Sequence, residues 1–161
     1  MDDSTEPASA GSASPDDVLA RAGLALGEEI LAALPTWAQR VVKERVGPTD
    51  DIATARAADV GRAMAESLAG PLAALLAADV DRQRGTPLTL LRAAHGPLTE
   101  FLRNTGASKP VRDEVDIAAN PDDVFAISPR QFLDLGDDVH EAGLRWGVAK
   151  AFAHRARHQQ Q

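Results

Sequence analysis

Hydrophobic residues recur at intervals of three and four along most of this chain, which is the period of an amphipathic α-helix. The first such stretch begins at Ser14 and Pro15, which suit the N-cap and the first helical position. We expect this helix to stop or kink at Pro35, because proline has no backbone N–H to donate. A second, shorter helix is predicted over 37–46.

The longest periodic stretch covers residues 50–84, where large apolar side chains form one stripe flanked by alanines. Gly70 and Pro71 lie near its middle. Since proline also crowds the preceding turn, a kink or break is expected there. The pattern predicts that this helix is the spine of the fold, with helices 15–34 and 138–156 packed on it.

The second half of the chain is less regular. Residues 86–105 predict two short helices or one bent helix, because His95-Gly96-Pro97 interrupts the period. Residues 106–127 carry no helical period and are predicted to form a long irregular segment. A short helix follows Ser128-Pro129, and the last helix is expected over 138–156.

Two sets of residues are predicted to form the core. In the last helix, Trp146 is expected on the shoulder, and the residues expected to face inward are Val139, Leu144, Val148, Ala151 and Phe152. The aromatic side chains expected in the core are Trp37, Phe101, Phe132 and Phe152.

Composition supports the helical interpretation. Alanine, the best helix former, occupies 31 of the 161 positions, and the aromatic and β-branched residues that favour sheets are sparse. The sequence therefore predicts an all-α protein: a single compact bundle of five or six helices with a kinked long central helix. Residues 1–13 are predicted to be a disordered acidic tail, 14–156 the helical domain, and 157–161 a frayed polar end.

The chain has no cysteine, which excludes disulfides, thiol catalysis and cysteine-ligated metal clusters. Its net charge of −7 argues against nucleic acid as the main partner, since phosphate binding needs a positive face. The N-terminus does not resemble a signal peptide, and the apolar stretch 67–78 is too short to span a bilayer. We therefore expect a cytoplasmic protein.

Four histidines could carry chemistry. His95 precedes a helix interruption, and His140 follows Asp137 and precedes Glu141, so that either imidazole could line a pocket. A hydrogen-bonded turn at His95 and a capped helix start at His140 are the plainer alternatives. His154 and His158 have a spacing that can hold a metal, but adjacent arginines oppose a bound cation. No metal, cofactor or catalytic residue is predicted.

Two charged segments are candidate binding surfaces. Asp122 and Asp123 follow a proline in the long irregular segment and could form an acidic loop that meets a basic partner. Alternatively they form a solvated turn. The basic residues of the last helix could touch RNA or anionic lipid, although cations also complement a helix C-terminus. These basic residues are Arg145, Lys150, Arg155 and Arg157.

Residues 121–155 contain two short sequence motifs that suggest a family resemblance. They are Pro121-Asp122-Asp123 and Leu144-Arg145-Trp146-Gly147. This segment resembles the C-terminal third of alanine-rich proteins of unknown function from high-GC Gram-positive bacteria. The resemblance implies no activity, cofactor or site.

Three hypotheses follow for function. The first is a non-catalytic interaction or regulatory module that binds a protein, with a homo-oligomer also open. The second is a nucleic-acid or ribosome-associated protein that uses the basic last helix. The third is a small-ligand binder or enzyme with a pocket at His95 or His140.

Overall fold

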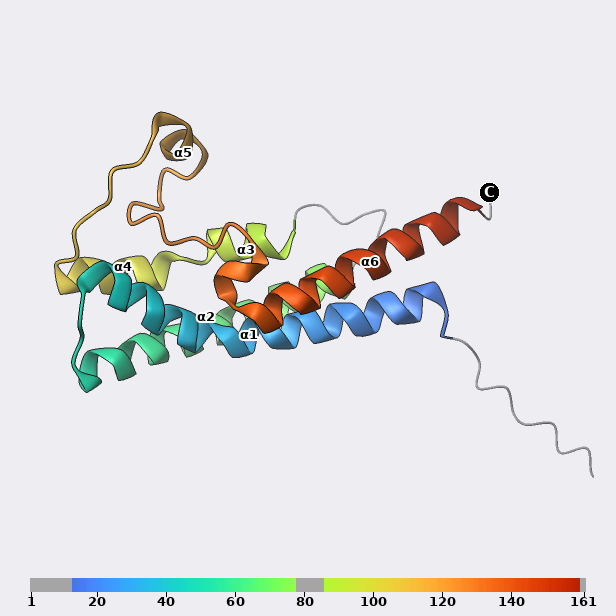
Figure 1. Ribbon diagram of the computed structural model, residues 1–161, viewed down its shortest axis with the longest axis horizontal. Coiled ribbons are helices and arrows are strands. Elements are labelled where there is room, and N and C mark those ends of the chain that lie inside the picture. Colours follow the sequence, from blue (N-terminus) through green and yellow to red (C-terminus); the bar gives the residue numbers. More distant parts are fainter. Residues whose placement is uncertain (1–12, 78–85, 160–161) are drawn as a thin grey trace, which may run out of the picture.

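The computed structural model describes residues 13–77 and 86–159, and within them the chain forms helices and connecting loops without a strand (Figure 1). The all-α prediction is therefore confirmed. Most of the predicted acidic tail, residues 78–84 of the predicted long helix and the last two residues lie outside the described residues. The helices are α1 (Pro15–Val46), α2 (Asp51–Ala77), α3 (Pro87–Ala93), α4 (Gly96–Thr105), α5 (Glu114–Ala119), the 3-10 turn η1 (Phe132–Leu135) and α6 (Asp137–Gln159).

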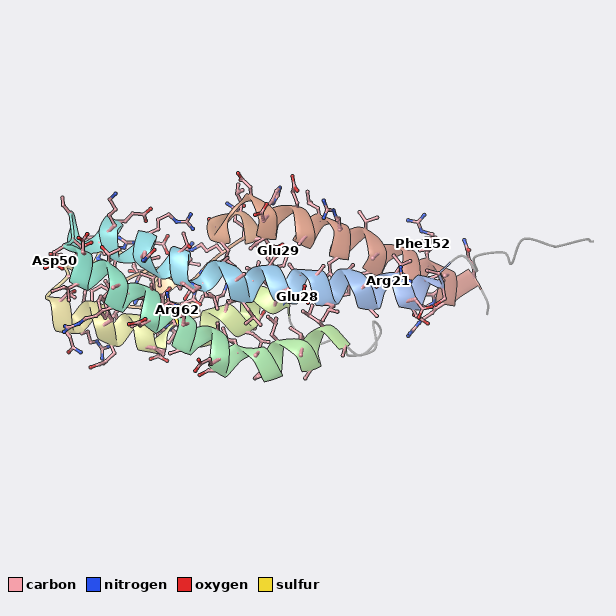
Figure 2. The ribbon with its side chains drawn as sticks, turned by 90° about the horizontal axis from the view of Figure 1, so that it is seen from below. Arg21, Glu28, Glu29, Asp50, Arg62 and Phe152 are labelled. Atoms are coloured by element: carbon pink, nitrogen blue, oxygen red, sulfur yellow. The ribbon has the colours of Figure 1, made fainter. Side chains whose placement is uncertain are left out.

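Helix α1 is the centre of the arrangement. It packs against α2, α4, α6 and η1, while α2 also contacts α3 and α4. Figure 2 shows α2 and α6 on opposite sides of α1, and both run antiparallel to it in Figure 1. The spine of the fold is thus α1, rather than the helix that begins near residue 50.

The prediction of a separate second helix over 37–46 is wrong. Helix α1 does not stop at Pro35 and continues through it to Val46. Buried side chains occur on both sides of the proline, with Leu34 and Trp37 nearest to it. Proline removes one helical hydrogen bond, but the packing of these side chains offsets that loss. Only a continuous helix keeps them all in the core. Helix α2 likewise continues through Pro71.

Helices α1 and α2 lie in close backbone contact at Gly61. A Cβ atom built at Gly61 would lie 2.6 Å from both the Leu34 carbonyl oxygen and the Pro35 Cα. Because both of those atoms belong to backbone, they cannot rotate away as the end of a side chain could. Glycine at this position therefore allows α1 and α2 to cross in direct backbone contact.

Helix α6 is rotated relative to the prediction. Val139 is buried as expected, but Trp146 is buried rather than on the shoulder. The other residues expected to face inward are exposed: Leu144, Val148, Ala151 and Phe152. Small residues explain the difference, because the buried side of α6 consists largely of alanine and glycine and so lies close to α1. These small buried residues are Ala142, Gly143, Ala149 and Ala153.

The aromatic core also differs from the prediction. Trp37 is buried, and Phe101 and Phe132 are half-buried against the core, whereas Phe152 is 52% exposed. Phe125, from the segment predicted to be irregular, is the largest fully buried side chain of the described residues. The ring of Phe132 occupies the space beside Gly143, only 2.3 Å from where a Cβ atom would lie.

Two boundaries need correction. The segment 106–127 contains the short helix α5, whose N-cap Asp113 accepts a hydrogen bond from the Asp116 N–H at 2.7 Å. Helix α6 continues through residues 157–159, which were expected to be frayed. An ion pair of 3.1 Å between Arg157 and Asp16 joins this end of α6 to the first turn of α1.

We expect Gly61→Ala to lower the free energy of unfolding by about 1–3 kcal/mol, because the new methyl group would push two backbones apart. Gly147→Ala is the matched control: it lies within α6, and a Cβ there meets nothing within 4 Å. The control should be stabilising by about 0.5–1 kcal/mol through helix propensity. Urea unfolding followed by circular dichroism measures both, and equal effects would contradict the close approach.

Candidate functional site

The structure does not place the two candidate pocket histidines in a common site. His95 is buried in front of α4, and its Nδ1 lies 2.8 Å from the Thr99 hydroxyl oxygen. His140 is half-buried in the first turns of α6. Neither residue lines any of the five principal cavities of the described chain. The geometry of His95 is that of a hydrogen-bonded helix start.

The four candidate basic residues of α6 are engaged differently from one another. Arg145 lies 3.7 Å from Glu141, and Arg157 pairs with Asp16. The ammonium of Lys150 lies 4.8 Å from the centre of the Trp146 ring, a cation–π contact. Arg155 is exposed. Because two of the four cations face carboxylates, the helix does not offer a uniformly positive surface.

The two aspartates of the candidate acidic loop have different environments. Asp122 is exposed, whereas Asp123 is buried and its two carboxylate oxygens accept hydrogen bonds from backbone N–H groups. The donors are Ile127 at 3.0 Å and Ser128 at 3.1 Å. Asp123 thereby fixes the turn that carries Phe125 into the core. A partner would meet one of these carboxylates and not a pair.

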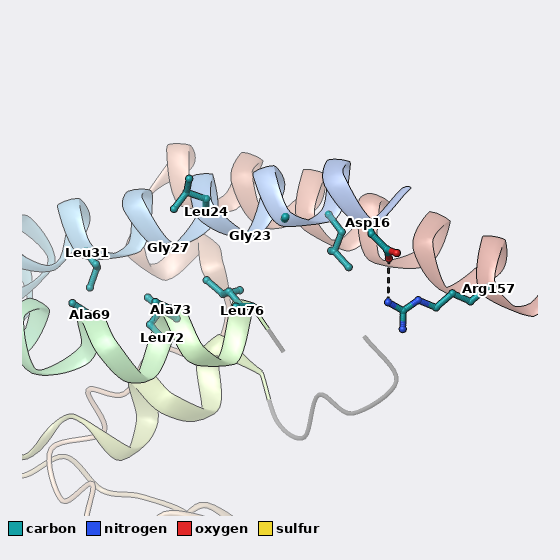
Figure 3. A pocket seen from close by; sticks show the side chains of 13 residues that line it. Asp16, Gly23, Leu24, Gly27, Leu31, Ala69, Leu72, Ala73, Leu76 and Arg157 are labelled. Atoms are coloured by element: carbon teal, nitrogen blue, oxygen red, sulfur yellow. Dashed lines mark hydrogen bonds and ion pairs between the residues drawn. The ribbon is translucent and has the colours of Figure 1, made fainter. Parts of the chain in front are cut away.

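Among the described residues, an apolar concavity lies between α1 and α2, at the end of the molecule where α1 begins (Figure 3). It has a volume of about 640 Å³ and is open to solvent along one side. We call it the α1–α2 groove. From α1 it is lined by Leu19, Ala20, Gly23, Leu24, Gly27 and Leu31, and from α2 by Ala69, Leu72, Ala73, Leu76 and Ala77.

Small residues create the groove. A Cβ at Gly23 would lie 3.4 Å from the Leu76 carbonyl oxygen, and one at Gly27 would lie 3.2 Å from a Leu76 methyl carbon. The floor is therefore shallow and closely packed, while Leu24 is 67% exposed on the rim. Asp16 and Arg157 are the two charged residues that line it, and they form its polar end.

Sequence reasoning did not identify this groove as a site. Gly23 and Gly27 matter because they let Leu76 of α2 approach α1 closely. One feature of the sequence could have indicated the groove: alanines spaced by four along α2, which the structure shows to be exposed. They are Ala69, Ala73 and Ala77. However, the sequence does not show that α1 pairs with α2, and without that knowledge these alanines indicate only a helix.

We expect Asp123→Ala to lower the free energy of unfolding by about 1.5–3 kcal/mol, because two buried backbone N–H groups lose a charged acceptor. Asp122→Ala is the matched control and should change it by less than about 0.5 kcal/mol. Chemical denaturation of the two variants checks this expectation. A larger loss in the Asp122 variant would contradict the structural role of Asp123.

Within the described ranges 13–77 and 86–159, no helix has the length and apolarity required to cross a membrane. Over the same residues, no three histidine, aspartate or glutamate side chains are grouped so that they could hold a metal ion. Comparison with protein-family models, curated proteins and solved structures gave no match to this chain.

Proposed function

We propose that this protein is a non-catalytic interaction module that holds an apolar helix of a partner protein in the α1–α2 groove. The observation that carries the proposal is the groove itself: an open, apolar trough between two helices, with an exposed leucine on its rim. Exposed apolar surface of this kind marks interaction sites in proteins. As part of the same proposal, we assign the protein to the cytoplasm, which the absence of cysteine favours.

The shape of the groove favours a helix over a compact small molecule. Its α1 wall extends from Asp16 to Leu31, which corresponds to about 22 Å along a helix axis. Both walls are helical, so that their side-chain rows offer grooves for the ridges of a third helix. Glycine and alanine let that helix approach closely. The occupant we infer is an amphipathic helix of about four turns, with apolar residues at intervals of three and four.

Polar groups suited to catalysis are not gathered in this groove. Its two charged side chains, Asp16 and Arg157, face each other at 3.1 Å. This pairing supports a binding role rather than the pocket enzyme considered from the sequence. The partly neutralised cations of α6 give less support to nucleic-acid association than the groove gives to protein binding.

A photo-reactive phenylalanine analogue placed at Ala73, on the groove wall, tests the proposal in a nuclease-treated lysate of the source organism. We expect one protein to cross-link from this position, with the attachment mapping to an amphipathic helix of that protein. Leu24→Glu should reduce the cross-linked product at least about tenfold, because it buries a charge against the occupant.

Val111 provides the control, since it is fully exposed and lies away from the groove. The analogue at Val111 should not cross-link the protein that is cross-linked from position 73. Val111→Glu should leave the cross-linked product from position 73 unchanged. The proposal fails if Ala73 yields no cross-link, or if Leu24→Glu leaves the product intact. A product that appears only without nuclease would favour the nucleic-acid hypothesis instead.

A further inference from the structure

Helix α6 carries a row of exposed large apolar side chains. Leu144, Val148 and Phe152 are 59%, 71% and 52% exposed, and their spacing of four places them along one side of the helix. We call them the α6 stripe. A row of three such side chains differs from the scattered exposed apolar residues found on most protein surfaces.

The side of α6 that faces the rest of the molecule is already filled. Ala142, Trp146, Ala149 and Ala153 are buried, and α6 packs on α1 and η1. These residues lie on the opposite side of the helix from Val148, given 100° of rotation per residue. Rotation of α6 to bury the stripe would expose Trp146. The stripe is therefore directed outward by the fold itself.

Charges extend the same face in both directions from Val148. Glu141 lies seven residues before Val148 and Arg155 seven residues after it, and both are exposed. Seven residues are close to two full turns, so these two charges lie in line with the stripe. Glu141 is 3.7 Å from Arg145, but an exposed pair of this kind is weak and can exchange partners.

From this arrangement we propose that the α6 stripe is the interface of a homodimer, in which two copies of α6 pack antiparallel about a two-fold axis at Val148. Such an axis brings together residues equidistant from Val148. Leu144 then meets Phe152 of the second copy, and Glu141 meets Arg155 of the second copy. Val148 meets its own equivalent.

Self-complementarity favours a second copy over an unrelated partner. A two-fold interface requires that each residue match the one equally far on the other side of the axis. The three apolar residues of the α6 stripe meet this requirement, and so do the two opposite charges that flank them, Glu141 and Arg155. Helix α6 lies on the opposite side of α1 from α2, and its stripe is directed away from α1, so the dimer would leave the α1–α2 groove open. The dimer is thus independent of the proposed groove partner.

Sedimentation velocity over a range of protein concentrations tests the proposal. The wild-type chain should approach twice its mass of 17.0 kDa as concentration rises. Val148→Glu should remain a monomer, since it places two carboxylates together at the axis. Leu24→Glu, which changes an equally exposed leucine in the groove, should dimerise like wild type. Circular dichroism confirms that each variant stays folded.

Charge reversal gives a sharper test of the antiparallel register. Glu141→Arg and Arg155→Glu should each weaken dimerisation at least about tenfold, since each creates two like-charge contacts per dimer. The double variant should recover most of the wild-type affinity. As a matched control, Glu100→Arg and Arg103→Glu reverse an exposed pair on α4 and should have no effect.

Because the chain has no cysteine, a single introduced thiol reports directly on the axis. Val148→Cys should form a disulfide-linked dimer on mild oxidation, well before Leu24→Cys does. The proposal is overturned by a wild-type monomer at all concentrations or by equal oxidation of the two cysteine variants. It is also overturned by a dimer that Leu24→Glu abolishes, or by a double charge variant no tighter than the singles.

Discussion

The backbone contact between α1 and α2 at Gly61 is the constraint on which the rest of the structure depends. It sets the distance between the two long helices at Leu34 and Pro35, and toward the start of α1 the same helices leave the α1–α2 groove between them. Close approach at Gly61 leaves no room there for a side chain. The core consists mainly of leucine, valine and alanine, together with the buried aromatic side chains of Trp37, Phe125 and Trp146.

The same constraint affects how α1 packs against its two main neighbours, α2 and α6. Its alanine, glycine and leucine positions serve α2 on one side and α6 on the other, and Gly23 lies within reach of both Leu76 and Trp146. The groove beside Leu24 is the part of α1 and α2 that their own contact leaves uncovered.

The sequence predicted the helices much better than it predicted their faces. The cap at Ser14, the proline after Thr86 and the glycine at 106 mark real boundaries, because capping is local chemistry. Pro35 misled because tertiary packing overrode a local preference. The prediction that the α6 stripe faces the core is wrong for another reason, because large apolar side chains were assumed to be the buried ones. In a closely packed alanine-rich fold, small residues face inward and large ones can be left outside.

The candidate site was less accessible to sequence reasoning. His95, His140 and the aspartates at 122 and 123 were recognisable as chemistry, but their roles depend on neighbours such as Thr99 and the backbone of Ile127. The groove depends on the pairing of two helices. Neither the roles of these residues nor the groove can be predicted from the spacing of residues along one helix.

The packing of α6 on α1, which brings Trp146 near Gly23, has a consequence for how the chain reaches this structure. These residues are more than a hundred positions apart, whereas α1 and α2 are joined by a short turn. Local contacts form early and distant ones late, because the entropy of closing a long loop must be overcome first. During synthesis, the helical hairpin of α1 and α2 can assemble while the last helix is still being made. Docking of α6 is then the closing step of folding, and until it occurs one side of α1 remains exposed to water.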